Sequence, residues 1–91
     1  TPTTSVSTLL PLVTLYARPE CHLCDEARAG LEAMLADGLA FDFEEVNIES
    51  DDELHARYLE RIPVIELDCE IVSELWLDGD GLRARLDTLS A

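Results

Sequence analysis

The sequence predicts a single α/β domain with the element order β-α-β-α-β-β-α, arranged in three layers around a four-stranded mixed sheet. In the first half of the chain, short apolar runs alternate with segments of helical periodicity, which is typical of βα units. In the second half, two apolar runs are separated by only two residues, which forces an antiparallel hairpin. A chain of 91 residues has room for only one core, so two-domain arrangements are excluded.

The first strand is predicted at residues 12–16, after a start that carries no structural pattern. Residues 1–10 are rich in Thr and Ser, and we assign them as a disordered arm, with the domain spanning residues 11–91. The run Leu-Val-Thr-Leu-Tyr that follows is apolar and contains β-branched residues, which favours a buried strand. Residues 18–20, Arg-Pro-Glu, end it.

A helix is predicted after this break, because apolar residues recur there every three or four positions. They form one expected inward face: Leu23, Ala27, Leu31, Met34 and Leu35. Gly38, directly after Asp37, is typical of a helix C-terminus.

The second strand is predicted around Phe41, Phe43, Val46 and Ile48. Its alternation slips by one place at Glu44–Glu45, so we expect a bulge or an early strand end there.

A second helix is predicted from a capping box in which Ser50 takes a helical amide and Glu53 reaches back. We expect Leu54, Tyr58 and Leu59 to face inward, and Pro63 to end the helix. Two strands at 64–67 and 70–73 then form the hairpin. A last helix carries Leu82, Leu86 and Leu89 behind the turn at residues 78–81.

The charge of the chain excludes several classes of partner. Asp and Glu number 20 against six basic residues, all Arg, which gives a formal net charge of −14. A nucleic-acid binder needs clustered positive charge, so we expect no binding to nucleic acid or to an anionic membrane surface. No apolar run approaches the roughly 20 residues of a transmembrane helix. We expect a monomer.

The cysteine count indicates the compartment. Three cysteines, an odd number, do not make the even framework of a small secreted disulfide scaffold. A reducing environment, the cytoplasm, is therefore predicted. Cys69 is expected at the hairpin tip as an incidental surface thiol.

Cys21-His22-Leu23-Cys24 is the motif with chemical content. It stands between the first strand and the first helix, so Cys21 falls near the helix start, where backbone amides favour a thiolate. Cys21 is then the exposed nucleophile, and Cys24, one turn along and facing inward, is the thiol that resolves a mixed disulfide. The carboxylates of Glu20, Asp25 and Glu26 offset part of this effect on Cys21.

Together with Arg61-Ile62-Pro63-Val64, this motif resembles the thioredoxin superfamily, and within it the small glutaredoxin-like domains. The resemblance covers residues 12–89 and implies a thiol-disulfide oxidoreductase. It also implies that Pro63 is cis and lies against the active-site disulfide, with the backbone at Ile62 pairing to substrate. Arg18 matches a basic position near the family's active site. We therefore expect a substrate-binding set of Arg18, Ile62 and Pro63, together with His22, which lies between the cysteines where typical glutaredoxins have Pro-Tyr. The resemblance implies a partner that is a disulfide-containing protein or a glutathione mixed disulfide.

Glutathione is a candidate co-substrate, and no covalently bound cofactor is expected. Members that bind glutathione carry a Gly-Gly pair before the last helix, where this chain has Ser73 and Glu74. The Glu74 carboxylate would oppose an anionic ligand.

Two alternatives remain. In the first, the domain is a catalytically silent binding module that docks a protein through its sheet edge and Trp76, although Trp76 is more often part of a core in such a position. In the second, Cys21, Cys24 and His22 join Cys69 or His55 around zinc or an iron-sulfur group. Closed zinc sites generally draw on two compact ligand pairs, and only one is present, so we predict no metal.

Overall fold

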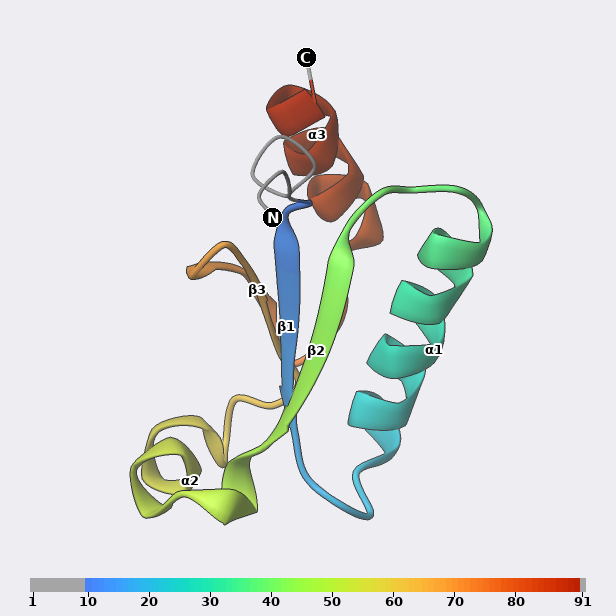
Figure 1. The fold of residues 1–91 in the computed structure, drawn as a ribbon. Helices are drawn as coiled ribbons and strands as arrows, with labels where there is room; N and C mark the ends of the chain where they lie inside the picture. The colour runs from blue at the N-terminus through green and yellow to red at the C-terminus, as the bar shows by residue number, and fades with distance from the viewer. Residues whose placement is uncertain (1–9, 91) are drawn as a thin grey trace, which may run out of the picture.

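The computed structural model describes residues 10–90 and contains the predicted order of elements (Figure 1). Four strands form one mixed sheet in the order β2-β1-β3-β4. Strand β1 (Leu12–Ala17) runs parallel to β2 (Asp42–Asn47) and antiparallel to β3 (Val64–Leu67), and β3 pairs antiparallel with β4 (Glu70–Glu74). Strands β2 and β4 are therefore the edges of the sheet. Residues 1–9 of the predicted arm lie outside the described residues.

The helices lie on both sides of this sheet. Helix α1 (His22–Ala36) lies to the right of the sheet in Figure 1, and α2 (Asp52–Tyr58) lies at its lower left, after a short 3-10 turn, η2 (Ile48–Ser50). Helix α3 (Gly79–Ser90) closes the chain. Within the described residues, no helix combines the length and the apolar character that crossing a membrane requires.

The inward stripe of α1 differs from the predicted one. Its buried side chains are Cys24, Ala27, Leu31 and Met34. Leu23 and Leu35 were expected on this stripe and are instead exposed. A helix turns by about 100° per residue, so once Cys24 points into the core its neighbour Leu23 is rotated toward solvent.

Strand β2 is regular where a bulge was expected. All six of its residues pair in register with β1, and Glu44 and Glu45 are both exposed because β2 is an edge strand. The irregularity of the sheet lies instead between Ile65 and Glu66 of β3, opposite β4.

The start of α2 is shifted by one residue from the predicted capping box. The Asp51 carboxylate accepts hydrogen bonds from the amides of Glu53 and Leu54, whereas the Ser50 hydroxyl donates to the carbonyl of Asn47 at 2.7 Å. Asp and Ser are both good N-caps, so the sequence did not distinguish them. Tyr58 is buried as predicted, but Leu59 is exposed.

The hairpin and the last helix agree with prediction. Asp68 (φ 50°) and Cys69 (φ 74°) form the two-residue turn with left-handed backbones, as tight hairpins require. In α3, Leu82 and Leu86 are buried, and the side chain of Leu89 lies outside the described part. The Ile62–Pro63 peptide is cis, as the resemblance implied.

Candidate redox site

The motif Cys21–Cys24 stands where the central strand β1 passes into α1. Residues 18–20 make a tight connection in which Glu20 takes a left-handed backbone (φ 60°). Cys21 is the N-cap of α1: its backbone is extended, and its Sγ accepts a hydrogen bond from the amide of Cys24 at 3.2 Å. The sulfur therefore occupies the place of the capping oxygen of Ser or Asp, at the positive end of the helix.

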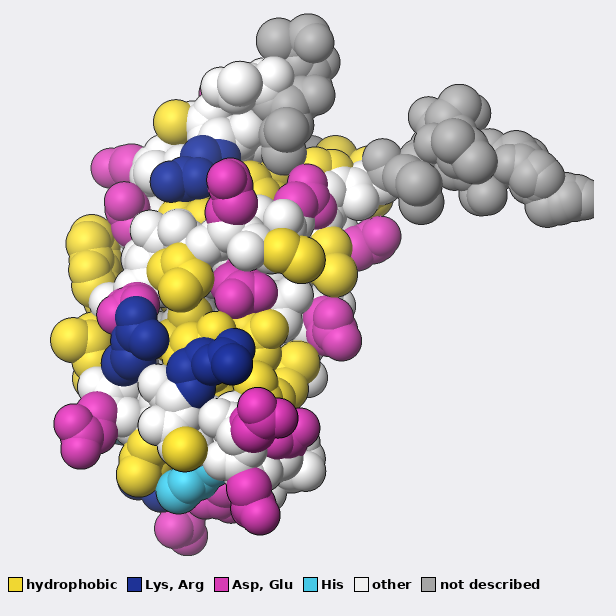
Figure 2. Space-filling view, turned by 90° about the vertical axis from the view of Figure 1, so that its left-hand side faces the viewer, with side chains coloured by type: hydrophobic (Ala, Val, Ile, Leu, Met, Phe, Trp, Pro, Cys, Tyr) yellow, Lys and Arg dark blue, Asp and Glu magenta, His cyan; other side chains and the backbone are white. Residues whose placement is uncertain are grey.

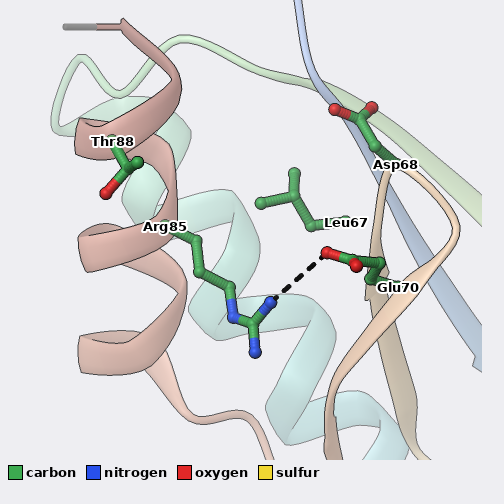
Figure 3. Close-up of a pocket in the computed structure, with 5 residues that line it drawn as sticks. All are labelled: Leu67, Asp68, Glu70, Arg85 and Thr88. Atoms are coloured by element: carbon green, nitrogen blue, oxygen red, sulfur yellow. Dashed lines mark ion pairs between the residues drawn. The ribbon is translucent and has the colours of Figure 1, made fainter.

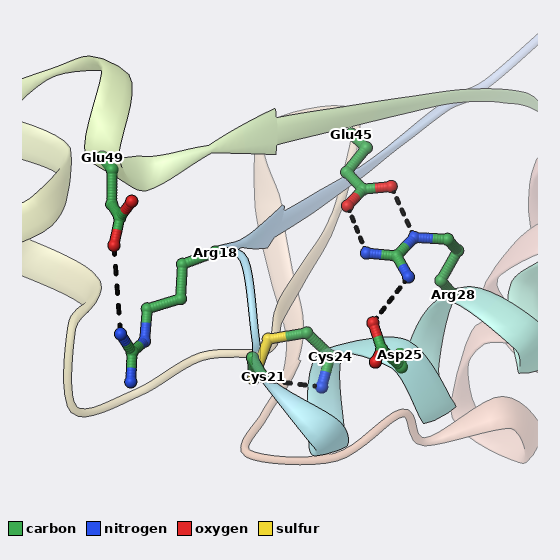
Figure 4. The surroundings of a disulfide bond; sticks show 7 residues. All are labelled: Arg18, Cys21, Cys24, Asp25, Arg28, Glu45 and Glu49. Atoms are coloured by element: carbon green, nitrogen blue, oxygen red, sulfur yellow. Dashed lines mark hydrogen bonds and ion pairs between the residues drawn. A yellow bond between two sulfur atoms is a disulfide. The ribbon is translucent and has the colours of Figure 1, made fainter.

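The two cysteines form a disulfide across the first turn of α1, with their Cα atoms 5.2 Å apart (Figure 4). Cys24 is fully buried, whereas Cys21 is only half-buried. Only one of the two sulfurs is thus open to a reagent from solvent, and it is the one at the helix terminus.

The side chain of His22 pairs with Glu26 and not with the cysteines of the disulfide. Its side chain is 84% exposed, and Nε2 lies 2.8 Å from Oε2 of Glu26, one turn along α1. Arg18 is likewise engaged elsewhere. Figure 4 shows its side chain running away from the disulfide toward Glu49 of η2, at 3.9 Å.

Arg28, which was not among the expected site residues, forms an ion-pair network beside the disulfide. Arg28 contacts Asp25 at 2.8 Å and forms two hydrogen bonds with the carboxylate of Glu45 on β2 (Figure 4). These hydrogen bonds raise the pKa of Arg28 further above its usual value. The i, i+3 spacing of Asp25 and Arg28 was the available signal. The network compensates one of the carboxylates at the start of α1.

Pro63 and Ile62 reach this end of the sheet through strand β3. The register pairs Tyr16 with Val64, so Pro63 comes opposite Ala17, close in sequence to Cys21. Both Ile62 and Pro63 are buried. The amide of Ile62 donates to the carbonyl of Tyr58 at 3.0 Å, so it is already used within the protein. Pairing of a substrate with the Ile62 backbone would therefore depend on its carbonyl.

The segment before α3 has no open anion site of the glutathione-binding kind. Glu74 pairs with Arg61 at 2.5 Å. Ser73 accepts a hydrogen bond from the amide of Asp78 at 3.2 Å. The Asp78 carboxylate in turn accepts from the amide of Gly81 at 3.0 Å. A carboxylate of the chain itself thus occupies the start of α3.

Trp76 is exposed, contrary to the core position that we expected. It is 62% exposed, and Leu75 before it has a left-handed backbone (φ 71°) and is 52% exposed. The reversal at Leu75 turns the chain out of β4, so the alternation of the strand no longer applies to Trp76.

On the face of the sheet opposite α1, Tyr16 and Tyr58 form a partly buried cluster. The hydroxyls of Tyr16 and Tyr58 donate to the two oxygens of Glu66 at 3.2 and 3.4 Å, and their rings are 4.8 Å apart. Burial, and next the charge of Glu66, raise the pKa of Tyr16 to about 12. The guanidinium groups of Arg57 and Arg61 lie 5.8 and 5.9 Å from the Tyr58 ring. Figure 2, which views this side, shows arginines set among hydrophobic side chains.

Cys69 lies far from the disulfide. The amide of Asp68, next to it, donates to the carbonyl of Leu12 at the start of β1, whereas Cys21 follows the end of that strand. In residues 10–90 no three His, Cys, Asp or Glu side chains gather as metal ligands, so the set proposed for zinc is not brought together.

A hollow of about 260 Å³ lies at the Cys69 end, between the hairpin and α3 (Figure 3). Its lining includes Arg85 and Glu70, which are 3.7 Å apart and neutralise each other. None of the predicted site residues contributes to it.

The central strand, the C-x-x-C disulfide at the first turn of the next helix, and the cis proline before β3 define an α/β domain of the thioredoxin-like fold. More specifically, the chain belongs to the family described as the glutaredoxin-like domain (DUF836), which residues 12–87 match.

Solved structures agree with this assignment. A protein from Nitrosomonas europaea, known from a solution NMR structure, is 29% identical with a TM-score of 0.72, and the match covers 84% of this chain and 91% of that one. A structural genomics target from X. campestris is 36% identical with a TM-score of 0.67, covering 84% and 96%. A mutant thioredoxin from Halobacterium salinarum is 19% identical with a TM-score of 0.65, covering 97% and 81%, which shows the shared fold. No curated protein matches the chain significantly.

Proposed function

We propose that this protein is a thiol-disulfide oxidoreductase in which Cys21 is the nucleophile and Cys24 is the resolving thiol. The observation that carries the proposal is the asymmetry of the pair: a half-exposed sulfur at the N-cap of α1 is bonded to a fully buried sulfur one turn along. The partial positive charge of the helix terminus and the hydrogen bond from the Cys24 amide both favour the thiolate form of reduced Cys21.

The reaction transfers two electrons in two exchanges. The reduced Cys21 thiolate attacks one sulfur of a substrate disulfide, forms a mixed disulfide, and releases the other substrate sulfur as a thiolate that takes a proton from water. Cys24 then loses its proton and attacks the Sγ of Cys21. The second substrate thiolate leaves, and the Cys21–Cys24 disulfide forms. An external dithiol reductant restores the protein by the reverse exchanges.

The substrate contacts are assigned by analogy with the family. Pro63 and the carbonyl of Ile62 align the substrate backbone, and Arg18 and His22 contact the groups that flank the disulfide. Both basic side chains pair with carboxylates of the protein itself, Glu49 and Glu26, so neither presents an uncompensated positive charge to the substrate. The protein would work as a monomer in a reducing compartment such as the cytoplasm.

The partner is a disulfide-containing protein or a glutathione mixed disulfide. Glutathione as co-substrate has the weaker support of the two, because the Arg61–Glu74 pair and the Asp78 cap occupy the segment that holds its carboxylate in glutathione-binding relatives.

Equilibration in graded mixtures of oxidised and reduced dithiothreitol tests the proposal. We expect a reversible two-electron transition between the dithiol and the Cys21–Cys24 disulfide, read by alkylation and mass spectrometry, with catalysis of insulin reduction above the uncatalysed rate. A disulfide that forms reversibly and catalyses no exchange with any substrate would overturn it.

The exposed Leu75 and Trp76 favour one second candidate, a binding module whose cysteines are inert. The two functions differ in what Cys21→Ser does. In the oxidoreductase the substitution abolishes exchange, whereas in the module it leaves the affinity for a bound protein unchanged.

A further inference from the structure

Next to the disulfide lies a hollow of about 250 Å³ that the proposed reaction does not use. It is lined by Leu23, Glu26 and Ala27 of α1 and by Trp76 and Leu77 of the segment before α3. Leu23 stands between the two cysteines in the sequence, so the hollow begins at the first turn of α1, where the disulfide lies.

The rim of this hollow is apolar and exposed. Leu23 is 48% exposed, and Leu75 and Trp76 are more exposed still. Single exposed hydrophobic side chains need no explanation, but Leu23 and Trp76 come from two separate segments that meet at this hollow, and Leu75 adjoins Trp76 in the chain. Such an arrangement is typical of a surface that receives an apolar side chain from a partner.

The segment that carries Trp76 is held in place from both sides. The amide of Leu75 donates to the carbonyls of Arg61 and Pro63 at 3.1 and 2.8 Å, which ties it to the cis-proline loop. On the other side, Leu77 packs against α1 at Gly30, where an added Cβ would lie 2.7 Å from a Leu77 methyl group. The left-handed backbone of Leu75, uncommon for so large a side chain, is thus fixed by its neighbours and directs Trp76 outward.

The charges around the hollow select the kind of partner. Glu26, which pairs with His22, lines it, Glu20 precedes Cys21, and Asp78, which caps α3, and Asp80 follow Leu77. Three arginines of this end of the molecule are already paired: Arg18 with Glu49, Arg28 with Asp25 and Glu45, and Arg61 with Glu74. A cationic partner therefore meets carboxylates here, whereas an anionic one meets three arginines, Arg18, Arg28 and Arg61, that already have carboxylate partners.

We propose that the hollow between Leu23 and Trp76 binds an apolar side chain of a protein substrate whose disulfide is flanked by Lys or Arg. This inference rests on the proposed exchange function and names its substrate class. Glutathione disulfide, with four carboxylates against two ammonium groups, fits neither the apolar rim nor the charge.

The docked disulfide is reduced by the same two thiol-disulfide exchanges that are described above. The reduced Cys21 thiolate attacks the disulfide of the docked segment and Cys24 releases it, so two substrate thiols and the Cys21–Cys24 disulfide are formed. The occupied hollow raises the local concentration of that disulfide at Cys21 and takes no part in the electron transfer.

Single-turnover rates of the reduced protein with defined disulfides test the proposal. The probes are symmetric peptide disulfides with Leu and two Lys beside Cys, with Leu and two Glu, and with Ser and two Lys, together with glutathione disulfide and the small neutral hydroxyethyl disulfide. Oxidation is followed by acid quenching and mass spectrometry. We expect the Leu-Lys peptide to react at least about tenfold faster than the Leu-Glu peptide and glutathione disulfide, and this preference to shrink at high salt.

Trp76→Ala and Ile71→Ala separate a docking role from a general effect. Ile71 is a comparably solvent-accessible hydrophobic side chain, 40% exposed, on β4 near the hairpin turn. Trp76→Ala should lower the ratio of Leu-Lys peptide rate to hydroxyethyl disulfide rate at least about threefold, and Ile71→Ala should leave that ratio unchanged.

The possible outcomes distinguish a failure of the docking inference from a failure of the exchange function. Reaction with hydroxyethyl disulfide but equal rates for the Leu-Lys, Leu-Glu and Ser-Lys peptides would overturn the docking inference and leave the exchange function standing. No reaction with any of the disulfides would overturn the exchange function and the docking inference together.

Discussion

The two ends of strand β1 each hold a cysteine that solvent can reach, and the two are built for different chemistry. Cys21 follows the end of β1 as the N-cap of a 15-residue helix, and its sulfur accepts an amide hydrogen bond. Cys69 lies beside the start of β1, in a two-residue turn with a left-handed backbone and no bonded partner cysteine. Exposure alone therefore does not make a redox cysteine, because the thiolate needs donors and positive potential around the sulfur.

The largest expected effect separates these two cysteines directly. Cys21→Ser should lower disulfide exchange by on the order of a thousandfold or more, since it removes the nucleophile. Cys69→Ser should keep the rate within about twofold, because Cys69 is not bonded to either cysteine of the disulfide and lies at the other end of β1. Insulin reduction with dithiothreitol as reductant measures both. Equal loss in the two variants would remove the distinction between the two ends.

Cys24→Ser tests the second sulfur. The variant should still attack a substrate but retain it as a mixed disulfide on Cys21, and turnover should fall by about a hundredfold, because an intramolecular step is replaced by attack from external thiol. Mass spectrometry of the non-reduced protein detects the adduct. If the variant turned over normally without a detectable adduct, Cys24 would not be the resolving thiol.

Arg28→Gln probes the electrostatics of the Cys21 end. Without the guanidinium, the charge of Asp25 at the start of α1 is uncompensated and opposes the thiolate. A charge at a helix terminus is worth about 0.3–1 kcal/mol, so we expect alkylation of reduced Cys21 by iodoacetamide at pH 7 to slow about two- to fivefold. Arg85→Gln, which breaks the pair with Glu70 near Cys69, is the matched control and should change nothing at Cys21. Identical rates in all three proteins would contradict this role of Arg28.

Cys69→Gly tests what Cys69 contributes to the stability of the hairpin turn. At φ 74° the backbone of Cys69 is in the region that glycine adopts without steric cost. The substitution should raise the free energy of unfolding by about 0.5–1 kcal/mol, measured by urea denaturation. Cys69→Ala keeps the Cβ and should give no gain. A glycine variant less stable than the alanine variant would show that the thiol itself stabilises the turn.

A last prediction concerns Tyr16, at high pH. Folding raises its pKa to about 12 from 10.0, so the neutral phenol is favoured in the folded state. The stabilisation is complete below pH 10 and is lost as the pH rises through 12, because the unfolded chain ionises first. Spectroscopic titration near 295 nm should show one phenol ionising late, and Tyr16→Phe should remove it. Two phenols that titrate together near pH 10 would contradict the assignment.

Much of the fold followed from the sequence because it depends on local patterns. Alternating runs and short connections fixed the element order, and the position of Cys21 between a strand and a helix gave its place at the N-cap. The cis state of Pro63 came from the family resemblance, since few X-Pro bonds are cis. Where the sequence failed, a choice between near-equal neighbours was decided by tertiary packing: Cys24 rather than Leu23 entered the core, and Asp51 rather than Ser50 capped α2.

The surroundings of the disulfide were harder to predict than the disulfide itself. Arg28 and Arg61 pair with carboxylates on strands, Glu45 of β2 and Glu74 of β4, which no local spacing relates to them. Trp76 was expected in the core because strand alternation was extended through Leu75, and one left-handed residue ended that alternation. Side-chain pairing across elements and single-residue reversals are set by the assembled fold.

The acidic edge of the sheet affects how one molecule can associate with another copy of itself. Strand β2 leaves one row of its backbone amides and carbonyls without a neighbouring strand, which is where chains stack and aggregate. Along this border stand the outward-facing Asp42, Glu44 and Glu45. Two copies that met border to border would bring the carboxylates of Asp42 and Glu44 together, and this repulsion opposes extension of the sheet from one molecule to the next.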